Sequence, residues 1–145
     1  MNTDPHPMYE WKTLPWSKIE RCVFKLQKRI YKASQRDDIY QVHKLQKLLI
    51  KSRYAKLLAI RKVTQDNHGA KTAGVDGVKY LTGKQRMRLS EKLGLHHRAK
   101  PLRRVWIPKP NSTEKRPLGI PVMRDRVLQA LLKLALEPEW EARFE

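Results

Sequence analysis

Cysteine is almost missing from this sequence. Cys22 is the only cysteine among 145 residues, so an internal disulfide and a cysteine-ligated zinc site are both excluded. Cys22 lies beside the apolar positions Ile19 and Val23 at helical spacing, and free cysteines are among the most buried residue types. We therefore expect Cys22 to be a small buried side chain and not a reactive thiol.

Long apolar runs are missing as well. No stretch approaches the roughly 18 consecutive apolar residues of a membrane-spanning helix. Residues 1–7 are polar and lack the apolar core of a secretion signal. We therefore expect an intracellular protein that is not secreted and has no membrane partner.

Acidic residues are the third deficit. Only 14 aspartates and glutamates stand against 32 lysines and arginines, and the formal net charge is +18. An excess of this size favours a polyanionic partner, with nucleic acid as the first candidate. The few acids also form no catalytic pattern, because Asp37 and Asp38 are adjacent and point apart, and Asp66 and Asp76 have no third acid close by. We therefore expect no catalytic residue and no metal ligand in this chain.

Apolar spacing predicts two helices at the start of the chain. From Trp16 to Ala33 the apolar residues recur at steps of three and four, and a second stripe runs from Ile39 through Leu49 toward Ile60. The outer sides of both helices are rich in cations with few acids between them. This pattern favours a surface that binds RNA or DNA, and an ordinary solvated surface stays open as the alternative. These cations are Lys18, Arg21, Lys25, Lys28, Arg29 and Lys32, then Lys44, Lys47, Lys51, Arg53 and Lys56.

Residues 67–77 hold three glycines and no apolar periodicity, so they are expected to form a loop. A glycine-rich backbone can approach a phosphate closely, although the spacing is not that of a Walker loop and a plain structural turn explains it at least as well. A short helix is expected after Thr82, ending near Gly94.

The stretch RRVWIPKPNSTEKRPLGIP, residues 103–121, predicts a β-hairpin. Lys109 and Arg116 flank its turn, and on antiparallel strands they can direct a point charge and a planar fork toward the same volume. Such a pair suits a triphosphate. On spacing alone, two exposed turn residues without a function stay open as the alternative.

The segment from Asp125 to Leu136 is the most apolar part of the chain and predicts a helix that anchors the core. Pro138 is expected to end it. The residues after Pro138 are locally acidic, unlike everything before them.

Several separated blocks of the chain carry a family resemblance. They are TAGVDGV at 72–78, LRRVWIPKP at 102–110, RPLGIPVMRDRVLQALLKLALEP at 116–138 and WEARFE at 140–145. In order and spacing they resemble the N-terminal part of group II intron-encoded reverse transcriptases and maturases. Trp11 and the segments LQKRIYKA and LQKLLIKS resemble the N-terminal extension of the same proteins. The resemblance therefore covers nearly all of the chain from Trp11 onward.

The resemblance implies the beginning of a right-hand polymerase that is incomplete here. It divides the chain into a flexible N-terminus at 1–10, a basic helical extension at 11–64, and the start of the fingers at 65–145. The fold class it implies is α+β and mainly helical, with a helical pair, a glycine-rich loop, the fingers hairpin and a C-terminal apolar helix.

The resemblance also implies roles for particular residues. Lys109 and Arg116 match the two fingers cations that grip a deoxynucleotide triphosphate. Contacts to intron RNA or to the template–primer are expected at Lys25, Lys28, Arg29, Lys44, Lys47, Lys51, Lys71, Gly74, Gly77, Arg103 and Arg104. A separate palm and thumb chain is a further expected partner if those parts are supplied in trans.

The departures from the family matter equally. In the family, a Tyr-Gly-Phe-Arg-Pro block follows the phenylalanine matched by Phe144, and the palm aspartates come later. The resemblance therefore implies no cofactor in this chain, Mg²⁺ only in a complete polymerase, and no DNA synthesis by this chain alone. The hairpin turn also lacks the glycine common in the family.

We therefore expect an RNA-binding N-terminal segment of a reverse transcriptase and maturase, working in a bacterial cytoplasm or an organelle. A stand-alone basic module that assists RNA folding or ribonucleoprotein assembly is the alternative, and a basic protein that binds nucleic acid without specificity is a third. In a complete enzyme part of the last helix would pack on the palm, so the isolated chain is expected to associate through exposed leucines. These are Leu128, Leu131, Leu132 and Leu136.

Overall fold

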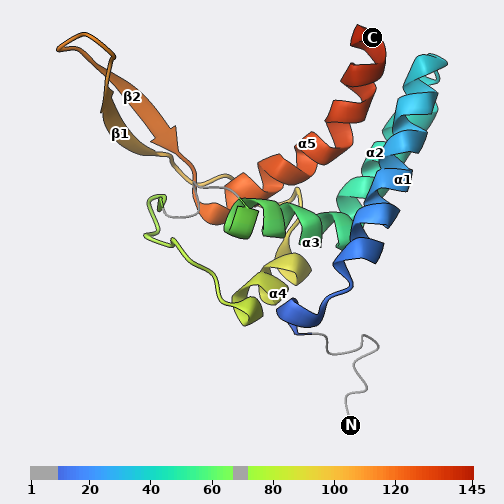
Figure 1. Cartoon of the computed structure of the whole chain (residues 1–145), viewed down its shortest axis with the longest axis horizontal. Helices are drawn as coiled ribbons and strands as arrows, with labels where there is room; N and C mark the ends of the chain where they lie inside the picture. The colour runs from blue at the N-terminus through green and yellow to red at the C-terminus, as the bar shows by residue number, and fades with distance from the viewer. Residues whose placement is uncertain (1–9, 67–71) are drawn as a thin grey trace.

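The computed structural model describes residues 10–66 and 72–145 (Figure 1). The α-helices are α1 (Trp16–Gln35), α2 (Ile39–Lys51), α3 (Arg53–Arg61), α4 (Gly83–Lys92) and α5 (Met123–Phe144). The strands β1 (Arg103–Pro108) and β2 (Lys115–Ile120) form one antiparallel hairpin, and two short helical turns, η1 (Trp11–Thr13) and η2 (Lys62–Asp66), flank the first three helices. The expected mainly helical α+β architecture is confirmed for this part of the chain. None of its helices has the length and apolar content needed to cross a bilayer.

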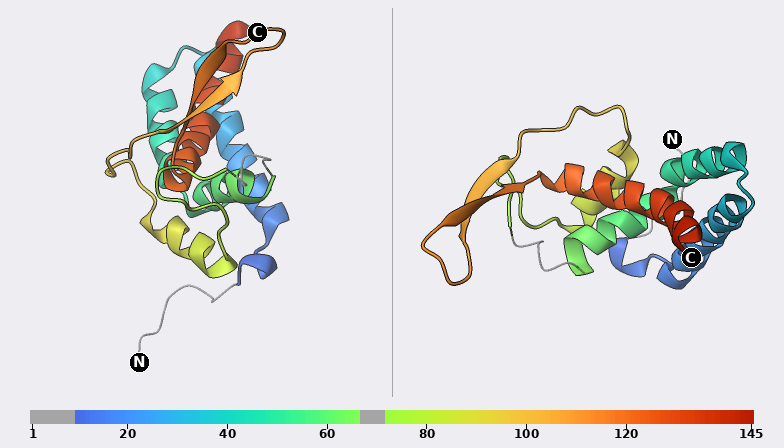
Figure 2. Two further views of the ribbon diagram at one scale, coloured as in Figure 1. Left: turned by 90° about the vertical axis from the view of Figure 1, so that its left-hand side faces the viewer. Right: turned by 90° about the horizontal axis from the view of Figure 1, so that it is seen from above.

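The helices form one body from which the hairpin projects. α1 and α2 lie side by side, and α5 packs against α1, α2 and α3 (Figure 1). The hairpin extends from the N-terminal end of α5 away from the helices, as the right-hand view of Figure 2 shows. Most hairpin residues are therefore exposed, and Ile120 at its base is buried.

The stripe predicted for α1 is buried. Ile19, Val23, Ile30 and Ala33 are at most 2% exposed and face the core. Cys22 is exposed, so its expected burial is wrong. It lies one position before Val23, at the edge of the buried stripe, where its side chain reaches solvent.

The expected helical pair is in fact three helices, because the second stripe is interrupted at Ser52. This residue is extended, with φ −67° and ψ 126°, and so ends α2. Its hydroxyl then accepts a hydrogen bond from the Ala55 amide at 3.4 Å, which caps the start of α3. Because the serine side chain accepts a hydrogen bond from a free amide at the start of α3, the break between the two helices costs little free energy.

The short helix expected after Thr82 is confirmed as α4. Its start is a capping box, in which the Gln85 amide donates to the Thr82 hydroxyl at 3.2 Å and the Gln85 side chain accepts from the Thr82 amide at 2.8 Å. α4 packs against α3 and η1.

The prediction that Pro138 ends the last helix is wrong, since α5 continues to Phe144. Pro138 has no N–H, so the Leu134 carbonyl one turn earlier loses its helical donor. The Gln27 side chain on α1 donates to this carbonyl at 3.0 Å. The hydrogen bond from Gln27 replaces the missing one, and Figure 1 shows α5 changing direction toward its C-terminal part.

A polar seam ties α1 and α2 to the same stretch of α5. The Ser34 hydroxyl donates to the Glu139 carbonyl at 3.0 Å, and Gln46 donates to the Ala135 carbonyl at 3.2 Å. The Glu139 carboxylate, 9% exposed, accepts from Gln46 at 2.8 Å and pairs with Arg143 at 3.3 Å. The buried carboxylate is therefore satisfied on both oxygens, which makes its burial tolerable.

The core confirms α5 as its anchor. Val127, Leu131 and Ala135 are 0% exposed and belong to one apolar cluster with residues from α1, α2 and α3. Leu131 therefore cannot contribute to an association surface, contrary to expectation. The same cluster includes Trp11 and Leu93, so both proposed segments, 11–64 and 65–145, contribute to it. The boundary between these segments stays a prediction.

Candidate nucleic-acid interface

The outer side of α1 forms a surface that we call the basic face. All of its cations are exposed and recur at steps of one, three or four, so they lie on one side of the helix, opposite the buried stripe. The only acid of α1, Glu20, is held away by an ion pair with Arg61 at 3.0 Å. Positive charge on this surface is therefore not offset by any acid of α1. The basic face consists of Lys18, Arg21, Lys25, Lys28, Arg29 and Lys32.

The lysines expected to bind RNA on α2 are also exposed. Lys44, Lys47 and Lys51 lie on the side of α2 that faces away from the buried Val42 and Leu49, and α2 contains no acidic residue. The structure thus places all six expected helical RNA contacts on the outer sides of two adjacent helices. Their binding of RNA stays a prediction.

The hairpin register decides which cations share a surface. Ile107 pairs with Arg116, and the Lys109 amide donates to the Glu114 carbonyl at 2.9 Å just beyond the last strand pair. Opposed residues of two antiparallel strands point to the same side, and side chains alternate along each strand. Lys109 and Arg116 therefore lie on one side, which we call the Lys109 face, together with Arg103. The opposite side is called the Trp106 face, and it consists of Arg104, Trp106, Pro108, Lys115, Pro117 and Gly119.

Lys109 has an ionic partner that sequence reasoning missed. Its Nζ lies 3.0 Å from Glu114 Oε2, and both side chains are largely exposed. Within the part of the chain that the structure describes, Arg116 lies in no ion pair. The spacing of Lys109 and Glu114 across a short turn was the only available signal for their pairing. An exposed pair of this kind is worth about 0–1 kcal/mol, so it can be displaced by a stronger anion.

The hairpin turn has an asparagine in the left-handed conformation that glycine usually adopts. Asn111 has φ +58°, the left-handed conformation that asparagine tolerates better than most residues. The Ser112 hydroxyl accepts from the Glu114 amide at 3.1 Å and closes the turn. The departure from the family pattern therefore still gives an ordered hairpin tip.

Gly74 and Gly77 of the glycine loop are each explained by the local structure. A Cβ on Gly74 would lie 2.8 Å from the Val122 backbone, so only glycine allows this loop to approach the base of the hairpin. Gly77 has φ +73° and donates its amide to the Gly74 carbonyl at 3.1 Å. Lys71 lies outside the described residues. RNA contacts at Gly74 and Gly77 stay predictions.

The first turn of α5 fixes the loop and the hairpin relative to each other. Arg126 donates through Nε to the Pro121 carbonyl at 2.9 Å and through Nη2 to the Thr72 carbonyl. Burial of Arg126 lowers its pKa, an effect that Asp76 opposes. Beside it, the buried Asp125 carboxylate accepts from the Lys100 amide at 2.9 Å. These positioning residues were not identified from the sequence.

Comparison with known proteins identifies the family. A family model described as the N-terminal domain of reverse transcriptase matches residues 11–93. The chain belongs to this family. Maturase-like protein 1 of Euglena gracilis is 39% identical over 140 residues, which cover 89% of this chain and 29% of that protein.

Two further relatives match the chain. Protein YkfC of Escherichia coli K12 is 33% identical over 128 residues, covering 84% of the chain and 33% of that protein. Group II intron-encoded protein LtrA of Lactococcus lactis subsp. cremoris is 44% identical over 45 residues, covering 31% of the chain and 8% of that protein. The resemblance to group II intron reverse transcriptases and maturases is thereby confirmed. The domain spans about a third of the length of the first two of these relatives.

The described residues were also compared with the ligand set that the Mg²⁺ of a polymerase needs. In residues 10–66 and 72–145, no three histidine, cysteine, aspartate or glutamate side chains gather as metal ligands would. Octahedral Mg²⁺ needs oxygen ligands, chiefly carboxylates, that converge on one point. The expectation that Mg²⁺ belongs only to a complete polymerase stays a prediction.

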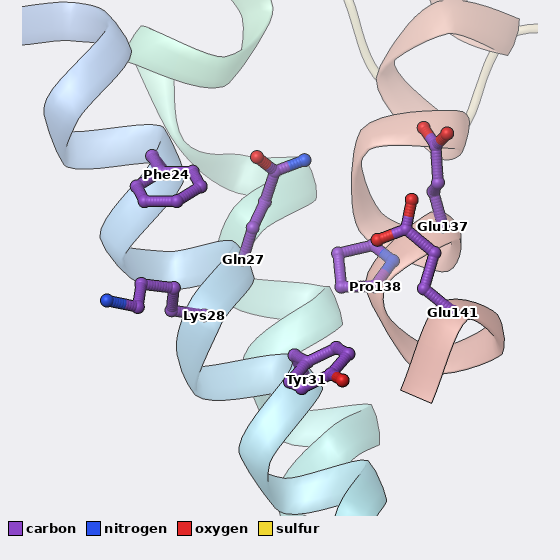
Figure 3. Close-up of a pocket in the computed structure, with 7 residues that line it drawn as sticks. All are labelled: Phe24, Gln27, Lys28, Tyr31, Glu137, Pro138 and Glu141. Atoms are coloured by element: carbon purple, nitrogen blue, oxygen red, sulfur yellow. The ribbon is translucent and has the colours of Figure 1, made fainter. Parts of the chain in front are cut away.

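A cavity of about 300 Å³ lies between α1 and α5 (Figure 3). Phe24, Lys28 and Tyr31 line it on the α1 side, facing Glu137 and Glu141 on α5. A hydrogen bond from Tyr31 to the Glu145 carboxylate raises the pKa of the tyrosine. Because two carboxylates border the cavity against one lysine, it is unsuited to an anionic nucleotide.

Proposed function

We propose that this domain binds RNA through the basic face of α1 and the outward lysines of α2. The observation that carries the proposal is the run of exposed cations on α1 with its only acid, Glu20, paired elsewhere. Phosphates that bind such a surface release counterions, which supplies affinity without base readout. Intron RNA or a template–primer is the proposed partner, in a bacterial cytoplasm or an organelle.

We further propose that the Lys109 face holds the triphosphate of a deoxynucleotide in a complete polymerase. The hairpin register puts the lysine point charge and the arginine fork on one side of a projecting hairpin, which supports this role. Release of Lys109 from Glu114 would free one of the two cations. The palm, with Mg²⁺, would come from the same longer chain or from a separate palm and thumb chain.

The RNA proposal is tested with a triple variant of the basic face, Lys25→Gln, Lys28→Gln and Arg29→Gln. Log affinity falls with log salt concentration, and each lost phosphate contact should make this negative slope shallower by about 0.7–0.9, so a total change of about 2–3 is expected. The matched control replaces the exposed Lys84, Lys92 and Lys133 by glutamine, with the same change in net charge. Fluorescence anisotropy with a structured intron RNA and a scrambled RNA measures both.

Equal losses in the two triple variants would show that only total charge matters. Equal affinity of the parent domain for structured and scrambled RNA would favour the non-specific basic protein. A clear preference for structured RNA, lost selectively in the α1 variant, supports the proposal.

The nucleotide proposal is tested in a protein in which this domain continues into a palm. Lys109→Ala and Arg116→Ala should raise the KM for deoxynucleotide while RNA affinity barely changes. Lys115→Ala is the matched control, because Lys115 adjoins Arg116 and lies on the opposite side of the hairpin. At saturating template–primer its KM should stay near that of the parent. If both Lys109→Ala and Arg116→Ala instead weaken RNA binding and leave extension intact, the stand-alone RNA-binding module is the better description.

A further inference from the structure

The Trp106 face is a second, chemically distinct surface of the hairpin. Trp106 is 55% exposed and lies opposite Pro117, while Arg104 and Lys115 are exposed on the same side. The hairpin register places Glu114 on the Lys109 face, so the Trp106 face carries no acid. This surface is therefore aromatic and positively charged, and it cannot contact the ligand of the Lys109 face.

The indole of Trp106 differs from the other three, each of which has an arginine over its ring. Arg86 lies over Trp11 at 5.4 Å, Arg61 over Trp16 at 4.9 Å, and Arg143 over Trp140 at 5.3 Å. These contacts use the ring surface of each indole. Among the residues that the structure describes, Trp106 has no cation over its ring and no aromatic neighbour. Its ring surface is available to an external partner.

The combination points to one class of partner. A base has a flat π surface that can stack on an indole, and the phosphates on either side of it need cations nearby. Arg104 is two residues before Trp106, roughly 6.6 Å along the strand, and Lys115 flanks the indole on the neighbouring strand. Duplex RNA is excluded, because its bases are already stacked inside the helix and are not free to meet a side chain.

We propose that the Trp106 face binds an unpaired stretch of RNA, with one base stacked on Trp106 and the adjacent phosphates held by Arg104 and Lys115. This inference rests on the proposed RNA binding of the domain and assigns a separate subsite to it. Recognition by stacking is tolerant of sequence, since every base has a π surface. The subsite therefore selects for strand state and not for a particular sequence.

The test measures the affinity of the 145-residue chain for a single-stranded 12-nucleotide RNA by fluorescence anisotropy. Trp106→Leu keeps an apolar side chain and removes the ring, so single-strand affinity should fall by about 5- to 150-fold, the equivalent of one stacked base. Trp106→Phe keeps a ring and should retain most of the affinity. Arg104→Gln and Lys115→Gln should each reduce the salt slope by about 0.7.

Four controls isolate stacking from charge and from folding. Trp140→Leu removes an indole that is 48% exposed but belongs to the acidic segment of α5 that holds Glu137 and Glu141, and single-strand affinity should not change. The same RNA annealed to its complement, and inorganic polyphosphate, which has no bases, should bind Trp106→Leu as tightly as the parent. Circular dichroism melting checks that the variants are folded. Because Trp106 is exposed, its substitution should leave the fold intact.

Two results would overturn the inference. One is single-strand affinity of Trp106→Leu equal to that of the parent or of Trp140→Leu. The other is an equal loss on single-stranded RNA, duplex RNA and polyphosphate, which would show an indirect effect on charge or shape. The proposed function fails through a different result. If the α1 triple variant binds RNA as tightly as the parent, the basic face is not an RNA-binding surface, whatever Trp106→Leu shows.

Discussion

At the scale of single residues, the ion pair between Lys109 and Glu114 governs how available the Lys109 face is. The pair is exposed and spans 3.0 Å, so Glu114 competes with any anion for the lysine. Exposed pairs contribute about 0.2–1 kcal/mol, a factor of about 1.5–5 in binding. In a palm-containing protein, Glu114→Gln should therefore lower the KM for deoxynucleotide by about 1.5- to 5-fold.

The control for this prediction is Glu91→Gln, an exposed glutamate on α4 that changes the net charge equally. Its KM should match the parent's at the same ionic strength. A KM that rises in Glu114→Gln would mean that Glu114 positions Lys109 for the nucleotide and does not compete with it.

The two described loop glycines should respond differently to substitution. Gly74→Ala inserts a Cβ 2.8 Å from the Val122 backbone, and overpacking of this kind costs about 1–3 kcal/mol. A Cβ added at Gly77 would meet nothing within 4 Å, but the residue has φ +73°. Gly77→Ala should therefore lower the free energy of unfolding by about 1–2 kcal/mol through backbone conformation alone.

Asparagine separates the two causes, because it tolerates positive φ but not the lack of space. Gly77→Asn should therefore be milder than Gly77→Ala, and Gly74→Asn should be at least as harmful as Gly74→Ala. Urea unfolding midpoints of the four variants provide the measurement. The opposite order at position 77 would mean that its φ is not what requires glycine there.

At the scale of elements, the continuity of α5 through Pro138 depends on a side chain from another helix. Gln27→Ala removes the donor to the Leu134 carbonyl, and an unpaired, partly buried carbonyl costs about 1–3 kcal/mol. Pro138→Ala supplies a backbone N–H to the same carbonyl. In the Pro138→Ala background, Gln27→Ala should therefore cost about 1 kcal/mol less than in the parent.

A double-mutant cycle in urea measures this coupling. The control cycle pairs Pro138→Ala with Gln35→Ala, an exposed residue at the end of α1, and its costs should add. Additive costs for Gln27 and Pro138 would show that Gln27 does not serve the carbonyl that proline leaves free.

These same elements show which features a sequence can predict. The start of α4 was predictable because Thr82 and Gln85 form their capping box over three positions, and the α1 stripe follows from periodicity. The shared side of Lys109 and Arg116 followed from strand alternation once the turn was located. The continuation of α5 was not predictable, because Gln27 lies 107 positions from Leu134 in the sequence. That Trp106, unlike the other three indoles, has no arginine over its ring likewise becomes visible only in the structure.

At the scale of the whole molecule, the charges are segregated. The net charge is +18, and cations crowd α1, α2 and the hairpin, while the C-terminal part of α5 carries Glu137, Glu139 and Glu141. The proposed RNA surfaces therefore lie on the basic elements. The acidic end of α5 would repel the same polyanion and limit where it can bind.

The end of α5 also carries an exposed apolar stripe. Leu136, Trp140 and Phe144 are spaced four residues apart and are 44%, 48% and 82% exposed, so they lie along one side of the helix. Leu131, expected to contribute to such a surface, is buried in the core instead. Contiguous exposed apolar surface promotes association, so the isolated chain should self-associate through this stripe at micromolar concentrations.

Sedimentation velocity over a concentration series tests this prediction. Replacing Trp140 and Phe144 by serine should weaken self-association at least tenfold, because both large apolar side chains leave the stripe. Tyr40→Ser, at a tyrosine on α2 that is 76% exposed, is the matched control and should leave association unchanged. A parent chain that stays monomeric throughout, or a Tyr40 variant that dissociates equally, would contradict an association surface on α5.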